Sequence, residues 1–134
     1  MTKKINIEVA LRIIDVAKKK AQEIGIPMNI AIVDEGANLV AFQRMDGAWL
    51  GSINIAFNKA YTARCFNIGT RELAPLCQPG QPLFGIHASN DGRLIIFAGG
   101  IPLKDGEDIV GAIGVSGGTV EQDQEVAEAG VSVF

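Results

Sequence analysis

Arg44 and Asp46 are the first side chains whose types and spacing could do chemistry. They lie near the end of an apolar run of strand length, in the segment Phe42-Gln43-Arg44-Met45-Asp46-Gly47. A guanidinium binds a carboxylate through two parallel hydrogen bonds, so Arg44 could hold a carboxylate-bearing ligand. The alternative is a surface pair between Arg44 and Asp46 themselves, which would contribute little to stability.

A second candidate is the turn formed by Gly117, Gly118 and Thr119. It follows an apolar run of strand length, and Thr119 with Gln122 makes the pattern of a helix capping box. A helix N-terminus leaves backbone N–H groups without partners, and these attract anions. The turn therefore either binds an anionic ligand or only connects a strand to a helix.

His87 is the single histidine, so any Ser-His-Asp catalytic triad or Cys-His catalytic dyad would have to use it. As a neutral imidazole it could also coordinate a haem iron or another metal. The alternative is a structural or solvent-facing side chain. Trp49, close to Arg44 and Asp46 in the chain, is expected to be a packing anchor.

Two cysteines, Cys65 and Cys77, are too few and too far apart for a zinc site. We expect two free thiols in a reducing compartment, with a disulfide between the two cysteines as the alternative. The N-terminal segment has no long apolar stretch, since charged residues interrupt it, which predicts neither a signal peptide nor a membrane span. These features together predict a cytoplasmic protein.

The elements that must position these residues follow from the apolar periodicity. Helical spacing over residues 7–24 predicts an amphipathic helix that Asn6 caps and Gly25 ends. Its predicted buried face consists of apolar residues at steps of three and four: Ile7, Ala10, Leu11, Ile14, Ala17, Ala21 and Ile24. Strands at 28–33 and 39–44 form a hairpin. A helix at 50–67, rich in small residues, can lie close to a sheet or another helix.

The second half predicts a short turn from Thr70, a weak strand at 83–87, a strong strand at 94–98 and an edge strand at 101–104 that contains Pro102. A central strand at 109–116 and a helix at 119–129 complete the chain. Hairpins dominate, so we expect an α+β fold with a mainly antiparallel sheet covered by helices.

Composition limits the class of protein. The 134 residues fit one domain spanning 1–134, and 48% hydrophobic with 20% charged residues is typical of a compact fold. A net charge of -3 and 6% aromatic residues give no reason to expect nucleic-acid binding.

Four segments together resemble the GlcG/HbpS family, which includes haem-binding proteins and a domain fused to cobalamin adenosyltransferases. The segments are Ile30-Ala31-Ile32-Val33-Asp34, residues 42–47, Lys59-Ala60-Tyr61-Thr62-Ala63, and residues 111–119 followed by Gln122-Asp123. The resemblance implies a profilin-like α/β/α fold with a five-stranded antiparallel sheet. It also implies homo-oligomers, and a haem or a related ligand near subunit contacts in the members that bind one. Some members use a histidine early in the chain, whereas this chain has none before His87.

The leading hypothesis is a small ligand-binding protein, for haem or a cobalamin-type corrinoid, accessory to a catabolic operon. Its candidate site combines Arg44 and Asp46 with Gly117, Gly118 and Thr119, and with His87 as the metal ligand. One alternative is an enzyme for a small hydroxy acid or aldehyde, with Asp46 or His87 as general base. Another is a scaffold subunit without a small ligand, which assembles through the small-residue helix around Ala56 and Ala60.

Overall fold

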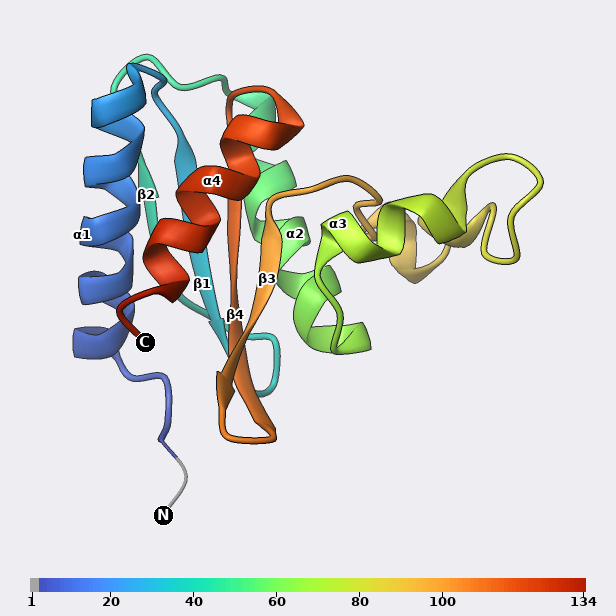
Figure 1. Ribbon diagram of the computed structural model, residues 1–134. Helices are drawn as coiled ribbons and strands as arrows, with labels where there is room; N and C mark the ends of the chain where they lie inside the picture. The colour runs from blue at the N-terminus through green and yellow to red at the C-terminus, as the bar shows by residue number, and fades with distance from the viewer. Residues whose placement is uncertain (1–2) are drawn as a thin grey trace.

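A four-stranded antiparallel sheet forms the middle layer of the protein in the computed structural model, which describes residues 3–134 (Figure 1). The strands lie in the order β2-β1-β4-β3, with bounds β1 Asn29–Asp34, β2 Leu39–Arg44, β3 Gly100–Asp105 and β4 Asp108–Ser116. The helices are α1 Ile7–Ile24, α2 Gly51–Phe66, α3 Thr70–Leu73 and α4 Val120–Val131. The predicted α+β class is confirmed.

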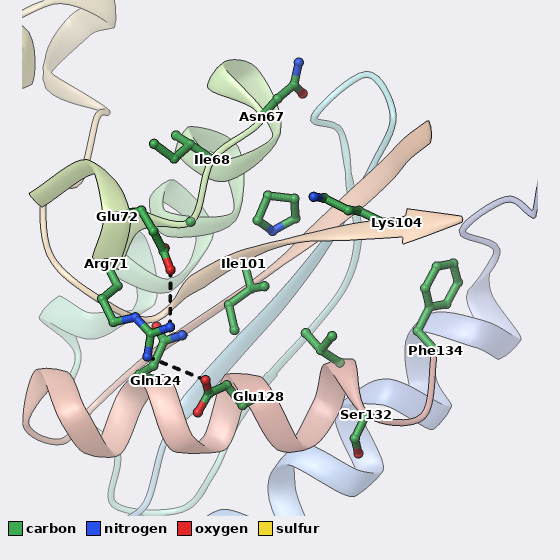
Figure 2. Close-up of a pocket in the computed structure, with 13 residues that line it drawn as sticks. Asn67, Ile68, Arg71, Glu72, Ile101, Lys104, Gln124, Glu128, Ser132 and Phe134 are labelled. Atoms are coloured by element: carbon green, nitrogen blue, oxygen red, sulfur yellow. Dashed lines mark hydrogen bonds and ion pairs between the residues drawn. The ribbon is translucent and has the colours of Figure 1, made fainter. Parts of the chain in front are cut away.

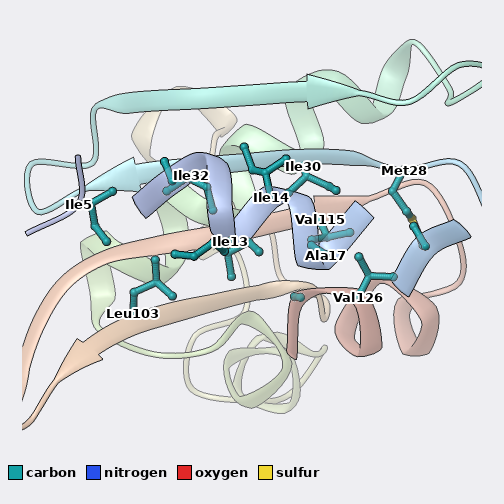
Figure 3. Packing of buried hydrophobic residues seen from close by; sticks show 14 of the residues in the cluster. Ile5, Ile13, Ile14, Ala17, Met28, Ile30, Ile32, Leu103, Val115 and Val126 are labelled. Carbon is teal, nitrogen blue, oxygen red and sulfur yellow. The ribbon is translucent and has the colours of Figure 1, made fainter. Parts of the chain in front are cut away.

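Helices α1 and α4 cover one face of the sheet, and α2 covers the other (Figure 1). The larger core lies under α1 and α4, where Ile13, Ile14 and Val126 meet Ile30 and Val115 from the strands (Figure 3). The smaller core lies under α2 and consists largely of alanines, including Ala56, Ala60 and Ala63. The small residues of α2 therefore let it approach its own sheet, and they are not available as an assembly surface.

Local signals place the helix ends as expected. The Asn6 side chain accepts a hydrogen bond from the Val9 N–H, and Gly25 ends α1 in the left-handed conformation with φ 76°. The buried face of α1 differs from the predicted one. Ile7 and Leu11 are exposed, whereas Ile13 is fully buried, because Ile13 belongs to the core that α1 shares with α4.

The prediction of a fifth strand is wrong. Residues 94–98 are not a strand, because the Ile95 N–H donates to the Thr62 hydroxyl of α2 at 3.0 Å and not to a neighbouring strand. Residues 83–87 are also not a strand, since Gly85 has φ 97° and a short 3-10 turn, Ile86–Ala88, follows it. The sheet accordingly has four strands.

Strand β3 is an edge strand, as Pro102 predicts. Thr70 does not cap the turn that follows α2, where Gly69 is the N-cap residue. The Thr70 hydroxyl instead accepts the Gly100 N–H at 2.9 Å, a hydrogen bond that fixes α3 beside the start of β3.

Residues 74–92 form an arm that extends sideways from the body of the protein beyond α3 (Figure 1). The arm returns to α2 at Arg93, whose guanidinium lies 3.6 Å from the ring centroid of Tyr61 and whose Nε donates to Asn58 at 3.1 Å. Within residues 3–134, the helices are all too short or too polar to cross a membrane.

Candidate functional site

The C-terminal ends of β2 and β4 lie at the same end of the sheet. In the strand register, Asn29 of β1 faces Arg44 of β2 on one side and Ser116 of β4 on the other. Because neighbouring strands are separated by nearly 5 Å, this register places the two strand ends roughly 10 Å apart. The predicted site segments, Arg44 with Asp46 and the turn at 117–119, are therefore brought to one end of the molecule.

A cavity of about 530 Å³, which we call the Arg44 pocket, lies between α1 and the end of β2. Its lining includes Lys18, Gln22, Phe42, Arg44, Met45 and Asp46. Among residues 3–134, Arg44 makes no ion pair or side-chain hydrogen bond, so the mutual pair with Asp46 is not formed. Lys18 is held only loosely, with Nζ 3.9 Å from Asp15. The pocket thus presents two cations beside apolar and acidic side chains.

A smaller cavity of about 350 Å³, the Trp49 pocket, lies at the same end of the sheet. Gly117, Gly118 and Thr119 line it together with Trp49 and Pro27. Trp49 is not the expected packing anchor, since 67% of it is exposed. Its backbone, not its ring, fixes the loop, because the Trp49 carbonyl accepts a hydrogen bond from the Asn29 amide at 3.1 Å.

The backbone donors at the start of α4 already have acceptors from α4 itself. The Gly118 N–H donates to Asp123 at 2.8 Å, and the Thr119 N–H donates to Gln122 at 2.9 Å. The Thr119 hydroxyl accepts from Gln122, which completes the predicted capping box. An anion at this turn would have to compete with these side chains for the donors.

A buried ion pair lies directly behind the turn. Lys59 Nζ of α2 is 2.7 Å from Asp123 Oδ2 of α4 and 2.8 Å from the Val115 carbonyl, and both side chains are almost fully buried. Lys59 Nζ also lies 5.1 Å from the centroid of the Phe97 ring. Asp123 therefore links α2 to the Gly118 backbone.

Burial shifts the ionisation of this pair in opposite directions. Desolvation lowers the pKa of Lys59, and the attraction of Asp123 offsets part of that shift. Desolvation likewise raises the pKa of Asp123, and Lys59 together with backbone N–H groups offsets part of it. Burial therefore disfavours each charge, and the contact between the two groups offsets part of that cost.

The sequence did not single out this pair, although a signal was present. Lys59 has Ala56 and Ala63 three and four residues away and Ala60 next to it, and all three alanines are buried. A charged residue on such a face needs a buried partner of opposite charge. Asp123 could not be chosen as that partner from the sequence, because 64 residues separate the two.

His87 lies on the arm, exposed, with its ring 5.9 Å from that of Phe84. It lines neither the Arg44 pocket nor the Trp49 pocket. The described part of the chain also holds no group of three or more histidine, cysteine or acidic residues suited to a metal ion. The structure therefore separates His87 from the other predicted site residues.

Fold and cavities together define a small α+β domain with basic and aromatic side chains at one end of its sheet. A family model described as haem degrading protein HbpS-like matches residues 5–132, so the chain belongs to the HbpS-like family. The family resemblance seen in the four sequence segments is confirmed.

Relatives of known sequence or structure support the assignment. The chain is 42% identical over 130 residues to an uncharacterized 15.0 kDa protein in the dhaT-dhaS intergenic region of Citrobacter freundii, covering 97% of this chain and 92% of that protein. It superposes on Klebsiella pneumoniae protein ORFY with a TM-score of 0.95 at 41% identity, covering 98% of this chain and 91% of that one. It superposes on the PduOC:heme complex with a TM-score of 0.95 at 30% identity, covering 98% of this chain and 96% of that one.

Proposed function

We propose that this protein binds a planar, carboxylate-bearing small molecule of the tetrapyrrole class, with Arg44 as the main anchor. The observation that carries the proposal is the state of Arg44. It lines a cavity of about 530 Å³ and has no ion-pair partner within residues 3–134. A guanidinium without an ion-pair partner can bind the carboxylate of a ligand through two hydrogen bonds.

The other side chains of the Arg44 pocket suit the same ligand. Lys18 provides a second cation, while Phe42 and Met45 provide apolar surface for a ring. The Asp46 carboxylate repels further negative charge in the pocket, which favours a ligand with few carboxylates. Support also comes from the similarity to the PduOC domain that was crystallised with heme.

The pocket fits the carboxylates of a haem but not its iron. No histidine or cysteine lines the pocket, and the Met45 sulfur already accepts the Met28 N–H at 3.3 Å. His87, on the arm, is not part of the lining. We therefore expect binding through charge and ring contacts of the Arg44 pocket, largely independent of the metal.

A corrinoid is the weaker candidate on the same grounds. Its peripheral side chains in cobalamin are neutral amides, which gain less from a guanidinium than a carboxylate does. Cobalamin binding should accordingly depend little on Arg44, and this dependence distinguishes the two ligands.

A titration with hemin, followed through its Soret band, tests the proposal. Charge-assisted hydrogen bonds contribute about 1.5–3 kcal/mol, so Arg44→Gln should weaken binding roughly 10- to 100-fold. Arg12→Gln, an exposed arginine of α1 outside the pocket, is the matched control and should bind like the native protein. His87→Ala should also bind like the native protein.

Two outcomes would refute the proposal. Equal affinity of the native protein and Arg44→Gln would remove Arg44 as the anchor. Loss of the Soret shift in His87→Ala alone would show that the iron is ligated by the arm.

We also propose that the protein forms a homo-oligomer and acts in the cytoplasm as an accessory to a catabolic operon. The arm supports assembly, because it carries Leu83 and Phe84 exposed on a segment that leaves the body (Figure 1). The free thiols of Cys65 and Cys77 agree with a reducing compartment. Sedimentation velocity should give a mass above one chain, reduced in Phe84→Ser. A monomer at all concentrations would contradict the assembly.

A further inference from the structure

Another cavity lies far from the Arg44 pocket in the fold, between the edge strand β3, the turn before α3, and α4. Its volume is about 650 Å³, within the usual range for small-molecule sites. Ile68, Ile101, Val131 and Phe134 give it an apolar wall. Figure 2 shows Gln124 and Arg71 at the end of the cavity away from Phe134.

Gln124 is the polar group that marks this cavity as a site. The residue is only 6% exposed, and its Oε1 accepts the Gly99 N–H at 3.1 Å. That bond fixes the amide orientation, so Nε2 must be a donor. Within residues 3–134, Nε2 has no acceptor, although Gln124 lines the cavity. Nε2 is therefore a donor that faces the open cavity, where an acceptor on a ligand can take the place of solvent.

The charges at the rim balance. Arg71 pairs with Glu72 at 3.2 Å and with Glu128 of α4 at 3.6 Å, as the dashed lines in Figure 2 mark. Lys104 is the second cation of the lining. The two cationic and two anionic side chains of the lining balance, which favours a neutral ligand over an anion or a cation.

A peptide strand is excluded as the occupant by the edge of β3. The Gly100 N–H points outward and is taken by Thr70, while the Gly99 carbonyl points inward and accepts the Val115 N–H. Because strand residues alternate, Pro102 occupies the next outward position, and it has no N–H to donate. Two consecutive outward positions of the edge therefore offer no free N–H for strand addition.

We infer that this cavity binds a neutral small molecule with an apolar body and a carbonyl oxygen, such as an amide, with the oxygen at Gln124 Nε2. The inference is independent of the Arg44 pocket, because the two cavities share no lining residue. The apolar body would lie along Ile101 and Val131, toward Phe134.

Three probes with one ring and different head groups test the inference: benzamide, benzoate and benzylamine. Each is titrated into ¹⁵N-labelled protein while backbone and side-chain amide shifts are recorded. Benzamide should shift the Gln124 side-chain amide and the backbone amides of Ile101 and Val131. Benzoate and benzylamine should bind at least about tenfold more weakly, because each adds a charge to a balanced cavity.

Gln124→Glu is the critical variant, because it keeps an acceptor for the Gly99 N–H and replaces the free donor with a carboxylate oxygen, and the control below adds the same charge to the same helix. Benzamide affinity should fall about tenfold, the loss of one hydrogen bond. Gln122→Glu, on the same helix but in the lining of the Trp49 pocket, is the matched control and should bind like the native protein. Val131→Phe, which places a larger side chain in the apolar part of the cavity and keeps Gln124, should abolish the shifts.

The inference is overturned by any of three results. These are no benzamide shifts at the cavity, equal binding of benzoate and benzamide, or unchanged benzamide affinity in both Gln124→Glu and Val131→Phe. Hemin binding by the same variants should stay native, so failure here is distinguishable from failure of the Arg44 pocket.

Discussion

Replacing Asp123 with asparagine removes the negative partner of Lys59 and leaves the shape of the site unchanged. Lys59 is fully buried, with Nζ 2.7 Å from Asp123 and 2.8 Å from the Val115 carbonyl, so the ammonium would lose its only anionic partner among the described residues. Breaking a buried pair in this way costs about 3–5 kcal/mol. A loss of that size is a large part of the roughly 5–15 kcal/mol that stabilises a typical domain.

A double-mutant cycle isolates the pair from the other contacts. Lys59→Met should also lose about 3–5 kcal/mol, since it leaves a buried carboxylate. The double variant Lys59→Met/Asp123→Asn has no charge to bury, and its asparagine oxygen can still accept the Gly118 N–H. We expect it to lie within about 2 kcal/mol of the native protein, with a coupling energy above about 2 kcal/mol.

Urea unfolding followed by circular dichroism measures all four proteins, with equal m values as the condition for comparing free energies of unfolding. Single variants whose losses simply add in the double variant would refute the coupling. A double variant less stable than either single variant would do so as well.

The pH dependence of Lys59→Met follows from the same contacts. Burial raises the pKa of Asp123, and removal of Lys59 takes away a charge that lowers it. The folded variant then binds the Asp123 proton more tightly than the unfolded chain does. Its penalty is complete above the folded pKa and disappears below the unfolded pKa of about 3.9. The deficit in the free energy of unfolding against the native protein should therefore shrink from pH 7 toward pH 4. A deficit that grows in acid would contradict this linkage.

Three further predictions concern single positions. Thr119→Ala removes the capping box and should lower the free energy of unfolding, measured in urea, by about 1 kcal/mol. An unchanged free energy of unfolding would show that the cap does not stabilise the protein. Gly114→Ala places a methyl group against the Ala56 carbonyl and should cost about 3 kcal/mol, while Gly51→Ala, in open space, should stay within about 1 kcal/mol of native stability. Exposed Cys65 should react with a thiol reagent before Cys77, because Cys77 is buried and burial raises the pKa of its thiol. Equal reaction rates of the two cysteines would contradict the burial of Cys77.

Much of the fold could be predicted because its signals are local. Asn6, Gly25 and Thr119 cap helices through their own short-range hydrogen bonds, and these ends are where the sequence puts them. The β2 strand also has the predicted bounds, 39–44. Residues 94–98 have the composition of a strand, but the pairing of Ile95 with Thr62 on α2 is a tertiary choice that no local pattern reveals.

The candidate site was less predictable, because it depends on what each side chain meets. Arg44 was expected beside an acidic neighbour, and only the structure shows that this ion pair is not formed. Trp49 has the size of a core residue, yet the loop holds it by its carbonyl and leaves the ring exposed. Lys59 and Gln124 act through partners on other elements, which spacing along the chain does not identify.

The affinity of the protein for metal-free protoporphyrin IX, compared with its affinity for hemin, tests the central claim most directly. Both ligands carry the same two carboxylates and the same ring, and they differ in the iron. If Arg44 is the anchor and no side chain ligates the iron, the two dissociation constants should agree within about threefold, and Arg44→Gln should weaken both by at least about tenfold. Hemin binding much more tightly than protoporphyrin IX, with no effect of Arg44→Gln, would contradict it.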